Sequence, residues 1–279
     1  MFSTLRIWFH VLLLITVAVT AHPVKKPTIV FVPGAWHTPA GYDKLLPLLH
    51  AAGYATTAVD LPSVGASPGV PDFSADVTAI RNTVSGLVEL LGRDVVVVSH
   101  SYGGVPATEA LRGLSKQDQR AQGGKGGVVG LAYVAAILPQ VGGSLATALE
   151  NKNDAEAAVA PTLETIDNGD GTETVVNPEE TFYGDVDPTE AAYCHRILRT
   201  QSTGPYLSPL TYDAYRHIPS GYLLCKQDKA IPYIKGQRLA REAGITFTET
   251  INSSHSPFLS HPEAVVRFIR RVAGERKKV

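Results

Sequence analysis

Cysteine is nearly absent from this sequence: Cys194 and Cys225 are the only two in 279 residues. So few cysteines exclude a disulfide-based scaffold and a zinc site made of four thiolates. Cys225 stands in an apolar run typical of a buried strand, so we expect two separate buried thiols rather than a disulfide.

An excess of charge is also missing, because 25 basic residues face 26 acidic ones and the formal net charge is −1. This balance argues against an extended interaction with nucleic acid or an anionic membrane. The glycine-rich segment 123–127 precedes a strand and has no Ser or Thr after its lysine, which excludes a phosphate-binding loop. We therefore expect no cofactor, no metal ion and no nucleic-acid partner.

A long apolar run opens the sequence. Arg6 precedes an apolar stretch over residues 7–19, and small residues at 19–21 offer a cleavage site. The segment is short for a membrane span and is typical of a secretory signal peptide. We expect a signal peptide at 1–21, a mature domain at 22–279, secretion, and no stable membrane association after cleavage. An uncleaved anchor or an unstructured leader is the alternative.

The composition of the chain, with 44% hydrophobic and 18% charged residues, is typical of a globular protein. Short β-branched runs alternate with segments of helical periodicity. Strands are expected at 28–32, 54–59, 94–98, 128–134, 221–225 and 246–251, and helices at 45–52, 73–91 and 262–273. This alternation predicts an α/β fold with one mostly parallel, doubly wound sheet and helices on both faces.

Residues 140–217 break the alternation, because they are acidic and turn-rich and contain no long apolar strand. Within them, residues 166–176 have the pattern of a hairpin around Asn-Gly and Asp-Gly turns. The acidic residues there lack the spacing and the final glutamate of a calcium-binding loop. We expect this segment to be a cap over one end of the sheet. Its apolar and aromatic side chains are expected to line a substrate pocket: Phe182, Tyr183, Tyr193, Tyr206, Leu207, Tyr212 and Tyr215.

Ser101 comes shortly after the predicted strand at 94–98 and precedes Gly103. A serine between a buried strand and a helix, with small residues two positions before and after it, is the pattern of a nucleophile elbow. Ser99 replaces the usual first glycine and keeps that position small. An ordinary surface serine in a strand-to-helix turn is the alternative.

A nucleophilic serine needs a base and an acid that orients the base, because its hydroxyl is unreactive at neutral pH. On this fold the order is serine, acid, histidine, and Asp228 and His255 each come after a later strand. Asp213 is the rival acid, but it precedes the strand at 221–225. We expect His100 to point away from Ser101 across the turn. The remaining candidates have structural explanations: His195, His217 and His261.

Acyl transfer also needs backbone N–H donors for the developing alkoxide, which together form an oxyanion hole. The N–H of Tyr102, directly after the serine, is one candidate, and the loop after the first strand offers another. Because Gly34 lets this loop turn its amides inward, Ala35 is the stronger candidate there and Trp36 the next. The side chains of Trp36 and His37 should either line the pocket or hold the loop.

Several motifs resemble the α/β-hydrolase superfamily, in the branch of plant methyl esterases, hydroxynitrile lyases and related bacterial and fungal esterases. They are FVPGAWH at 31–37, HSYGG at 100–104, DKAIP at 228–232 and HSPFLSHP at 255–262, in a resemblance that covers about residues 27–273. It implies the α/β-hydrolase fold and a serine hydrolase with the triad Ser101, Asp228 and His255. The family's His-Gly before the oxyanion loop is Pro33-Gly34 here, which leaves the amides in place.

Residues and resemblance together predict a carboxylic-ester hydrolase (a serine esterase) that cleaves a small to medium ester or lactone through an acyl-serine, as a monomer or homodimer. A hydroxynitrile-lyase-like reaction is an alternative. The lyases of this branch carry a lysine beside the catalytic histidine and a threonine in the loop, where this sequence has Ser256 and Gly34. A tailoring or binding protein of secondary metabolism on the same fold is a further alternative.

Overall fold

The computed structural model describes residues 25–159, 161 and 163–275. The expected signal peptide at 1–21 lies outside these residues.

The central sheet contains six strands in the order β2-β1-β3-β4-β8-β9, and every neighbouring pair is parallel. The strands are β1 (Thr28–Val32), β2 (Thr56–Ala58), β3 (Asp94–His100), β4 (Gly127–Val134), β8 (Ser220–Cys225) and β9 (Phe247–Ile251). Their inner members are runs of Val, Ile and Leu that are buried on both faces, as expected in a parallel sheet. The predicted fold class is thereby confirmed, although β2 is shorter than the expected strand at 54–59.

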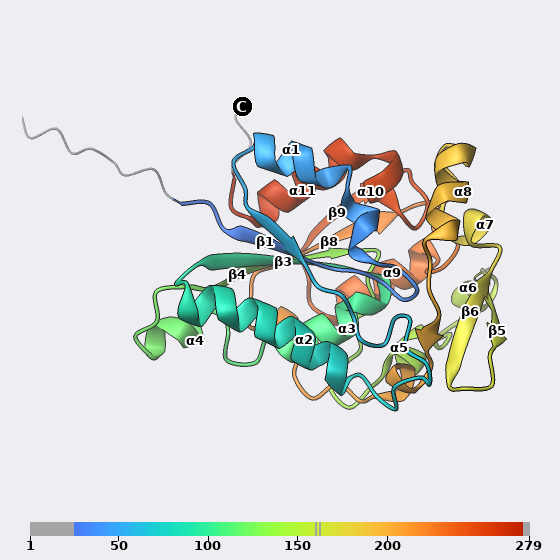
Figure 1. Ribbon diagram of the computed structural model, residues 1–279, viewed down its shortest axis with the longest axis horizontal. Coiled ribbons are helices and arrows are strands. Elements are labelled where there is room, and N and C mark those ends of the chain that lie inside the picture. Colours follow the sequence, from blue (N-terminus) through green and yellow to red (C-terminus); the bar gives the residue numbers. More distant parts are fainter. Residues whose placement is uncertain (1–24, 160, 162, 276–279) are drawn as a thin grey trace, which may run out of the picture.

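Helices cover both faces of the sheet (Figure 1). One layer contains α1 (Leu45–Ala51), α10 (Pro257–Ser260) and α11 (Pro262–Val272), and the other contains α2 (Ser74–Ser85), α3 (Gly104–Ala110) and α4 (Lys116–Ala121). A further helix, α9 (Tyr233–Glu242), packs against β8. The predicted helix at 73–91 is interrupted, because its last turn at Gly86–Leu90 is π-helical. The expected helices at 45–52 and 262–273 are confirmed within one residue at each end.

The chain between β4 and β8, residues 135–219, forms an insert whose elements gather at one end of the sheet (Figure 1). It contains a separate antiparallel sheet of β5 (Glu164–Asp167), β6 (Thr172–Val176) and β7 (Gln201–Ser202). The β5–β6 pair confirms the hairpin predicted at 166–176. The described part of the insert also contains short α-helices: α5 (Leu145–Leu149), α6 (Asp154–Ala157), α7 (Pro178–Phe182) and α8 (Pro188–Arg196).

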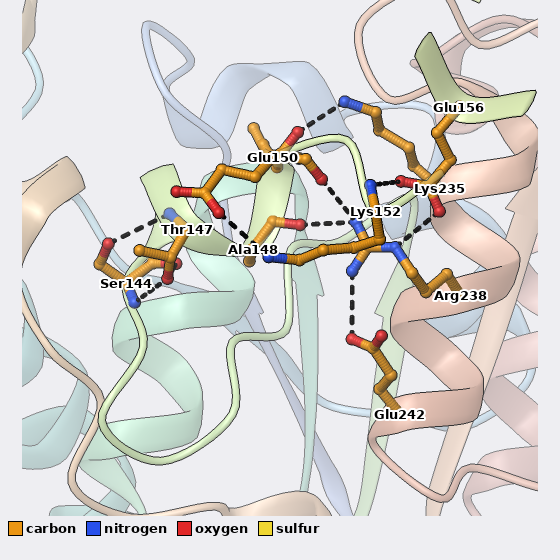
Figure 2. A network of polar contacts seen from close by, with 10 residues as sticks. Ser144, Thr147, Ala148, Glu150, Lys152, Glu156, Lys235, Arg238 and Glu242 are labelled. Carbon is orange, nitrogen blue, oxygen red and sulfur yellow. Dashed lines mark hydrogen bonds and ion pairs between the residues drawn. The ribbon is translucent and has the colours of Figure 1, made fainter. Parts of the chain in front are cut away.

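Buried polar contacts join the insert to α9 (Figure 2). The Arg238 guanidinium donates to Glu156 Oε1 at 2.8 Å and to the Ala148 carbonyl oxygen at 2.8 Å. Both charged side chains are almost completely shielded from solvent, at 4% and 1% exposure. The first part of the insert is therefore fixed to the main domain by a desolvated ion pair.

Cys194 and Cys225 are free, buried thiols, as predicted. Across the described residues, no helix has the length and hydrophobicity needed to cross a bilayer.

Candidate active site

Ser101 lies in a sharp turn between β3 and α3. Its backbone adopts φ 52°, a left-handed conformation that is unusual for a residue with a side chain. The turn also requires glycine at Gly103, because a Cβ there would lie 2.2 Å from the Pro33 carbonyl oxygen. The Ser101 carbonyl accepts a hydrogen bond from the Ile137 N–H at 3.0 Å. This strained turn leaves the serine partly exposed at the carboxyl end of the central strand, which is the local geometry of a nucleophile elbow.

Asp228 and His255 are brought together by the turns after β8 and β9. His255 Nδ1 donates to Asp228 Oδ2 at 2.8 Å, and both side chains are buried. The other carboxylate oxygen, Oδ1, accepts the N–H groups of Ala230 at 2.9 Å and Ile231 at 2.8 Å. Because the carboxylate acts only as an acceptor here, Nδ1 carries the imidazole proton and Nε2 keeps its lone pair.

No hydrogen bond joins Ser101 to His255 in the described chain, but the residue before Ser101 contacts His255 directly. His100 Nε2 donates to the His255 carbonyl oxygen at 3.0 Å, and the two imidazole rings lie 4.6 Å apart between centroids. Our expectation that His100 points away across the turn overlooked this role. Sequence carries no signal for it, because a histidine next to a serine has no periodicity or motif that specifies its partner.

Asp213 does not reach this site. Its carboxylate pairs with Arg216 at 3.6 Å and with His217 at 3.4 Å, within one short turn before β8. Asp228 is therefore the acid that the fold places beside His255.

The loop after β1 holds the candidate oxyanion donors. Within the described residues, the N–H groups of Ala35 and Tyr102 donate to no protein acceptor, so both remain available to a ligand. The Trp36 N–H differs, because it donates to Gln201 Oε1 at 3.3 Å. Trp36 is thus a weaker candidate than the sequence suggested, since its amide already has an acceptor.

The side chains of Trp36 and His37 hold the loop. Trp36 Nε1 donates to the Glu173 carbonyl oxygen at 3.3 Å, and His37 Nδ1 donates to the Ala35 carbonyl oxygen at 2.7 Å. His37 Nε2 then accepts from the Tyr183 hydroxyl at 2.9 Å. Burial lowers the pKa of His37 to about 4, so the imidazole is neutral at physiological pH.

Only part of the expected aromatic lining lies near these residues. Phe182 packs against His255 at 5.5 Å and against Trp36 at 5.8 Å between ring centroids, and Tyr206 lies 6.0 Å from Tyr102. Tyr183 also lies near them, through its bond to His37. The other four differ from the expectation: Tyr193 and Leu207 are 53% and 73% exposed, Tyr212 stacks on His217, and Tyr215 donates to the Pro139 carbonyl oxygen. Spacing alone could not separate them, because aromatic residues of a cap and of a core look alike in sequence.

Among the described residues, no group of three or more His, Cys, Asp or Glu side chains is arranged to hold a metal ion.

Residues 29–268 match the alpha/beta hydrolase family, and the chain belongs to this family. The alpha/beta hydrolase nvfD of Aspergillus novofumigatus is 36% identical over 251 residues, which cover 90% of this chain and 98% of that protein.

Two solved structures share the fold. Polyneuridine aldehyde esterase aligns with a TM-score of 0.71 at 18% identity, over 89% of this chain and 99% of its own. The methylesterase MES16 from Arabidopsis aligns with a TM-score of 0.70 at 22% identity, over 89% and 99%. The protein is accordingly an alpha/beta hydrolase, and its fold is shared by these two esterase structures.

Proposed function

We propose that this protein is a serine esterase that hydrolyses a small to medium carboxylic ester or lactone through an acyl-serine intermediate. The observation that carries the proposal is the oriented Asp228–His255 pair, with Nε2 of His255 left as a base, beside a serine in a strained strand-to-helix turn.

In this reaction Ser101 Oγ attacks the ester carbonyl carbon while His255 Nε2 takes the hydroxyl proton. The carbonyl oxygen becomes an alkoxide, which accepts hydrogen bonds from the N–H groups of Ala35 and Tyr102. Collapse of the tetrahedral intermediate breaks the bond to the leaving alcohol, which takes the proton from His255. A water molecule then repeats the sequence on the acyl-serine and releases the acid.

The insert serves as the cap in this proposal. The Phe182 ring packs against His255 and Trp36, and the Tyr206 ring packs edge-on against the Tyr102 ring. Such surroundings favour an apolar acyl or alkyl group. The lyase alternative gains no support, because Ser256, the residue after His255, is a buried serine that cannot offer a positive charge to cyanide.

A fluorophosphonate probe tests the serine mechanism. We expect it to label Ser101, and we expect Ser101→Ala to lower kcat for p-nitrophenyl butyrate by about 10³-fold or more, because the members of a triad act as a unit. Ser74→Ala, at an exposed serine of α2, is the matched control and should retain full activity. Labelling at another residue, or activity that survives Ser101→Ala, would rule out the mechanism. A panel of methyl esters and lactones of graded size then defines the substrate class.

A further inference from the structure

The backbone of Trp36 is held in an unfavourable conformation by the insert. Its φ of 63° is left-handed, which a bulky residue rarely adopts without outside support. Its N–H donates to Gln201 Oε1 at 3.3 Å, its carbonyl oxygen accepts from the Arg199 N–H at 3.0 Å, and its indole N–H donates to the Glu173 carbonyl oxygen. Every polar group of Trp36 thus bonds to the insert.

The Ala35–Trp36 peptide is fixed at both ends. His37 Nδ1 donates to its carbonyl oxygen at 2.7 Å, and its N–H donates to Gln201. Because Ala35 lies between Gly34 and this fixed peptide, the hydrogen bonds limit how far Ala35 can rotate. They also occupy the neighbouring Trp36 N–H, which leaves the Ala35 N–H as the candidate donor of this loop.

Gln201 has no freedom to turn its amide around. It is completely buried, and Nε2 donates to Ser63 Oγ at 3.1 Å and to the Ser202 carbonyl oxygen at 3.0 Å. Two acceptors on the nitrogen side require the oxygen to face Trp36. The backbone of β7 is itself joined to the loop after β2, where the Ser202 N–H donates to the Ser63 carbonyl oxygen at 2.9 Å.

The same network continues to the second candidate donor. Ser63 donates to Asp76 through its hydroxyl at 2.6 Å and through its N–H at 2.9 Å. Asp76 Oδ2 also accepts from the Tyr102 hydroxyl at 2.5 Å. Asp76 is fully buried on α2 and has no cationic partner among the described contacts, so these hydrogen bonds are what compensate its burial.

We propose that Gln201 and Asp76 are positioning residues for the oxyanion hole. Ser63 joins them, so that one buried network fixes both the loop of Ala35 and Tyr102. The inference rests on the proposed esterase function. It makes the insert a part of the catalytic apparatus, because the side chain of Gln201 holds an N–H donor loop that belongs to the main domain.

The test compares Gln201→Met, which keeps the length of the side chain but accepts no hydrogen bond from Trp36, with Thr203→Ala. Thr203 Oγ1 donates only to the Gly171 carbonyl oxygen inside the insert, so its loss leaves the network intact. With p-nitrophenyl butyrate as substrate, we expect Gln201→Met to lower kcat by about 10²-fold, close to the effect of losing one oxyanion donor. KM should change by less than about three-fold, and Thr203→Ala should leave both constants unchanged.

A trifluoromethyl ketone distinguishes positioning from a general loss of structure. This probe forms a tetrahedral adduct whose oxyanion needs the same donors as the transition state. We expect its Ki to rise in Gln201→Met by about the factor by which kcat/KM falls. An unchanged Ki, or a fall in activity that arises from KM alone, would overturn the inference.

Two smaller changes keep the proposal testable if Gln201→Met does not fold. Tyr102→Phe and Ser63→Ala each delete one hydroxyl of the network, and each should lower kcat and weaken the ketone by matching factors of about 10-fold. Fluorophosphonate labelling separates the two proposals. If the variants are labelled and fully active, the positioning roles are overturned and the esterase proposal is retained. If the wild-type protein is neither labelled nor active, both proposals are overturned.

Discussion

His37 holds the loop after β1 as a neutral imidazole. Its Nδ1 donates to the Ala35 carbonyl oxygen and its Nε2 accepts from Tyr183, so protonation at Nε2 would break the second bond. Burial lowers the pKa of this side chain from 6.5 to about 4. The unfolded chain therefore binds a proton at His37 before the folded chain does, and the folded state loses stability as the pH falls from about 6.5 to 4.

We predict that His37→Gln weakens this pH dependence. The lowered pKa of His37 reduces the free energy of unfolding of the wild type by about 3 kcal/mol once the pH is below 4. About 2 kcal/mol of this loss has occurred by pH 5. The variant should be less stable than the wild type at pH 7, because it loses the bonds to Ala35 or Tyr183. Its free energy of unfolding should then fall less between pH 7 and pH 5.

Urea unfolding at the two pH values measures this difference. His50→Gln is the control, because His50 is exposed on α1. Parallel pH profiles for the wild type and His37→Gln would show that His37 is not the residue that couples acidity to stability.

At the scale of elements, a buried ion pair between Arg238 and Glu156 joins α9 to the insert (Figure 2). Arg238 binds Glu156, Glu242 at 3.1 Å, and the carbonyl oxygens of Ala148 and Glu150 at 2.8 and 3.3 Å. The guanidinium thus satisfies carbonyl groups at the end of α5 as well as a buried carboxylate. Removing one charge from such a pair leaves the other uncompensated in a nonpolar environment.

We predict that Arg238→Met destabilises the protein by about 3–5 kcal/mol, as expected for breaking a buried pair from one side. The double variant Arg238→Met/Glu156→Met should recover a large part of this loss, because neither charge then remains buried. Thermal and urea unfolding give the free energies for the cycle.

Lys152→Ala is the matched control, since the Lys152–Glu150 pair is 44% and 61% exposed and should contribute less than about 1 kcal/mol. A double variant that is as unstable as the sum of the two single changes would contradict this account of the junction.

At the scale of the whole molecule, the sheet and the ends of its strands were predictable from sequence, whereas the buried network was not. Runs such as Val95–Val98 specify buried strands by composition, and the short turns after such strands keep the next residues at the carboxyl edge of the sheet. Ser101, Asp228 and His255 could be singled out for this reason, because each stands within a few residues of a strand end.

Gln201 and Asp76 have no comparable signal. Gln201 stands within a run of polar residues, 199–203, and belongs to a two-residue strand, so nothing in its sequence distinguishes it from its neighbours. Asp76 occupies a helix start where an exposed acid is the ordinary expectation. They are joined through Ser63 only because the insert folds back onto the loop after β2. Contacts between residues far apart in sequence depend on the complete fold, so local patterns could not predict them.

The two ends of the described chain are joined by a cluster of charges around Glu275. Its carboxylate binds Lys26, accepts from the Tyr54 hydroxyl at 2.7 Å and accepts from Arg270 Nε at 2.8 Å. Partial burial opposes ionisation of this group, but the hydrogen bonds outweigh it and lower the pKa of Glu275 to about 2. The stabilisation from ionised Glu275 is therefore complete above about pH 4.5 and is lost as the pH falls toward 2.

We predict that Glu275→Gln lowers the free energy of unfolding at pH 7 by about 1–2 kcal/mol, after allowance for solvent screening of a side chain that is 26% exposed. For a chain of this size the melting temperature should fall by roughly 2–6 °C. Calorimetry at pH 7 and at pH 3.5 measures the difference in stability between wild type and variant. This gap should be smaller at pH 3.5, because part of the stabilisation from ionised Glu275 is already lost there. Glu164→Gln, at an exposed position on β5, should show no gap at either pH. A gap for Glu275→Gln that stays constant with pH would mean that the carboxylate contributes through packing rather than through its charge.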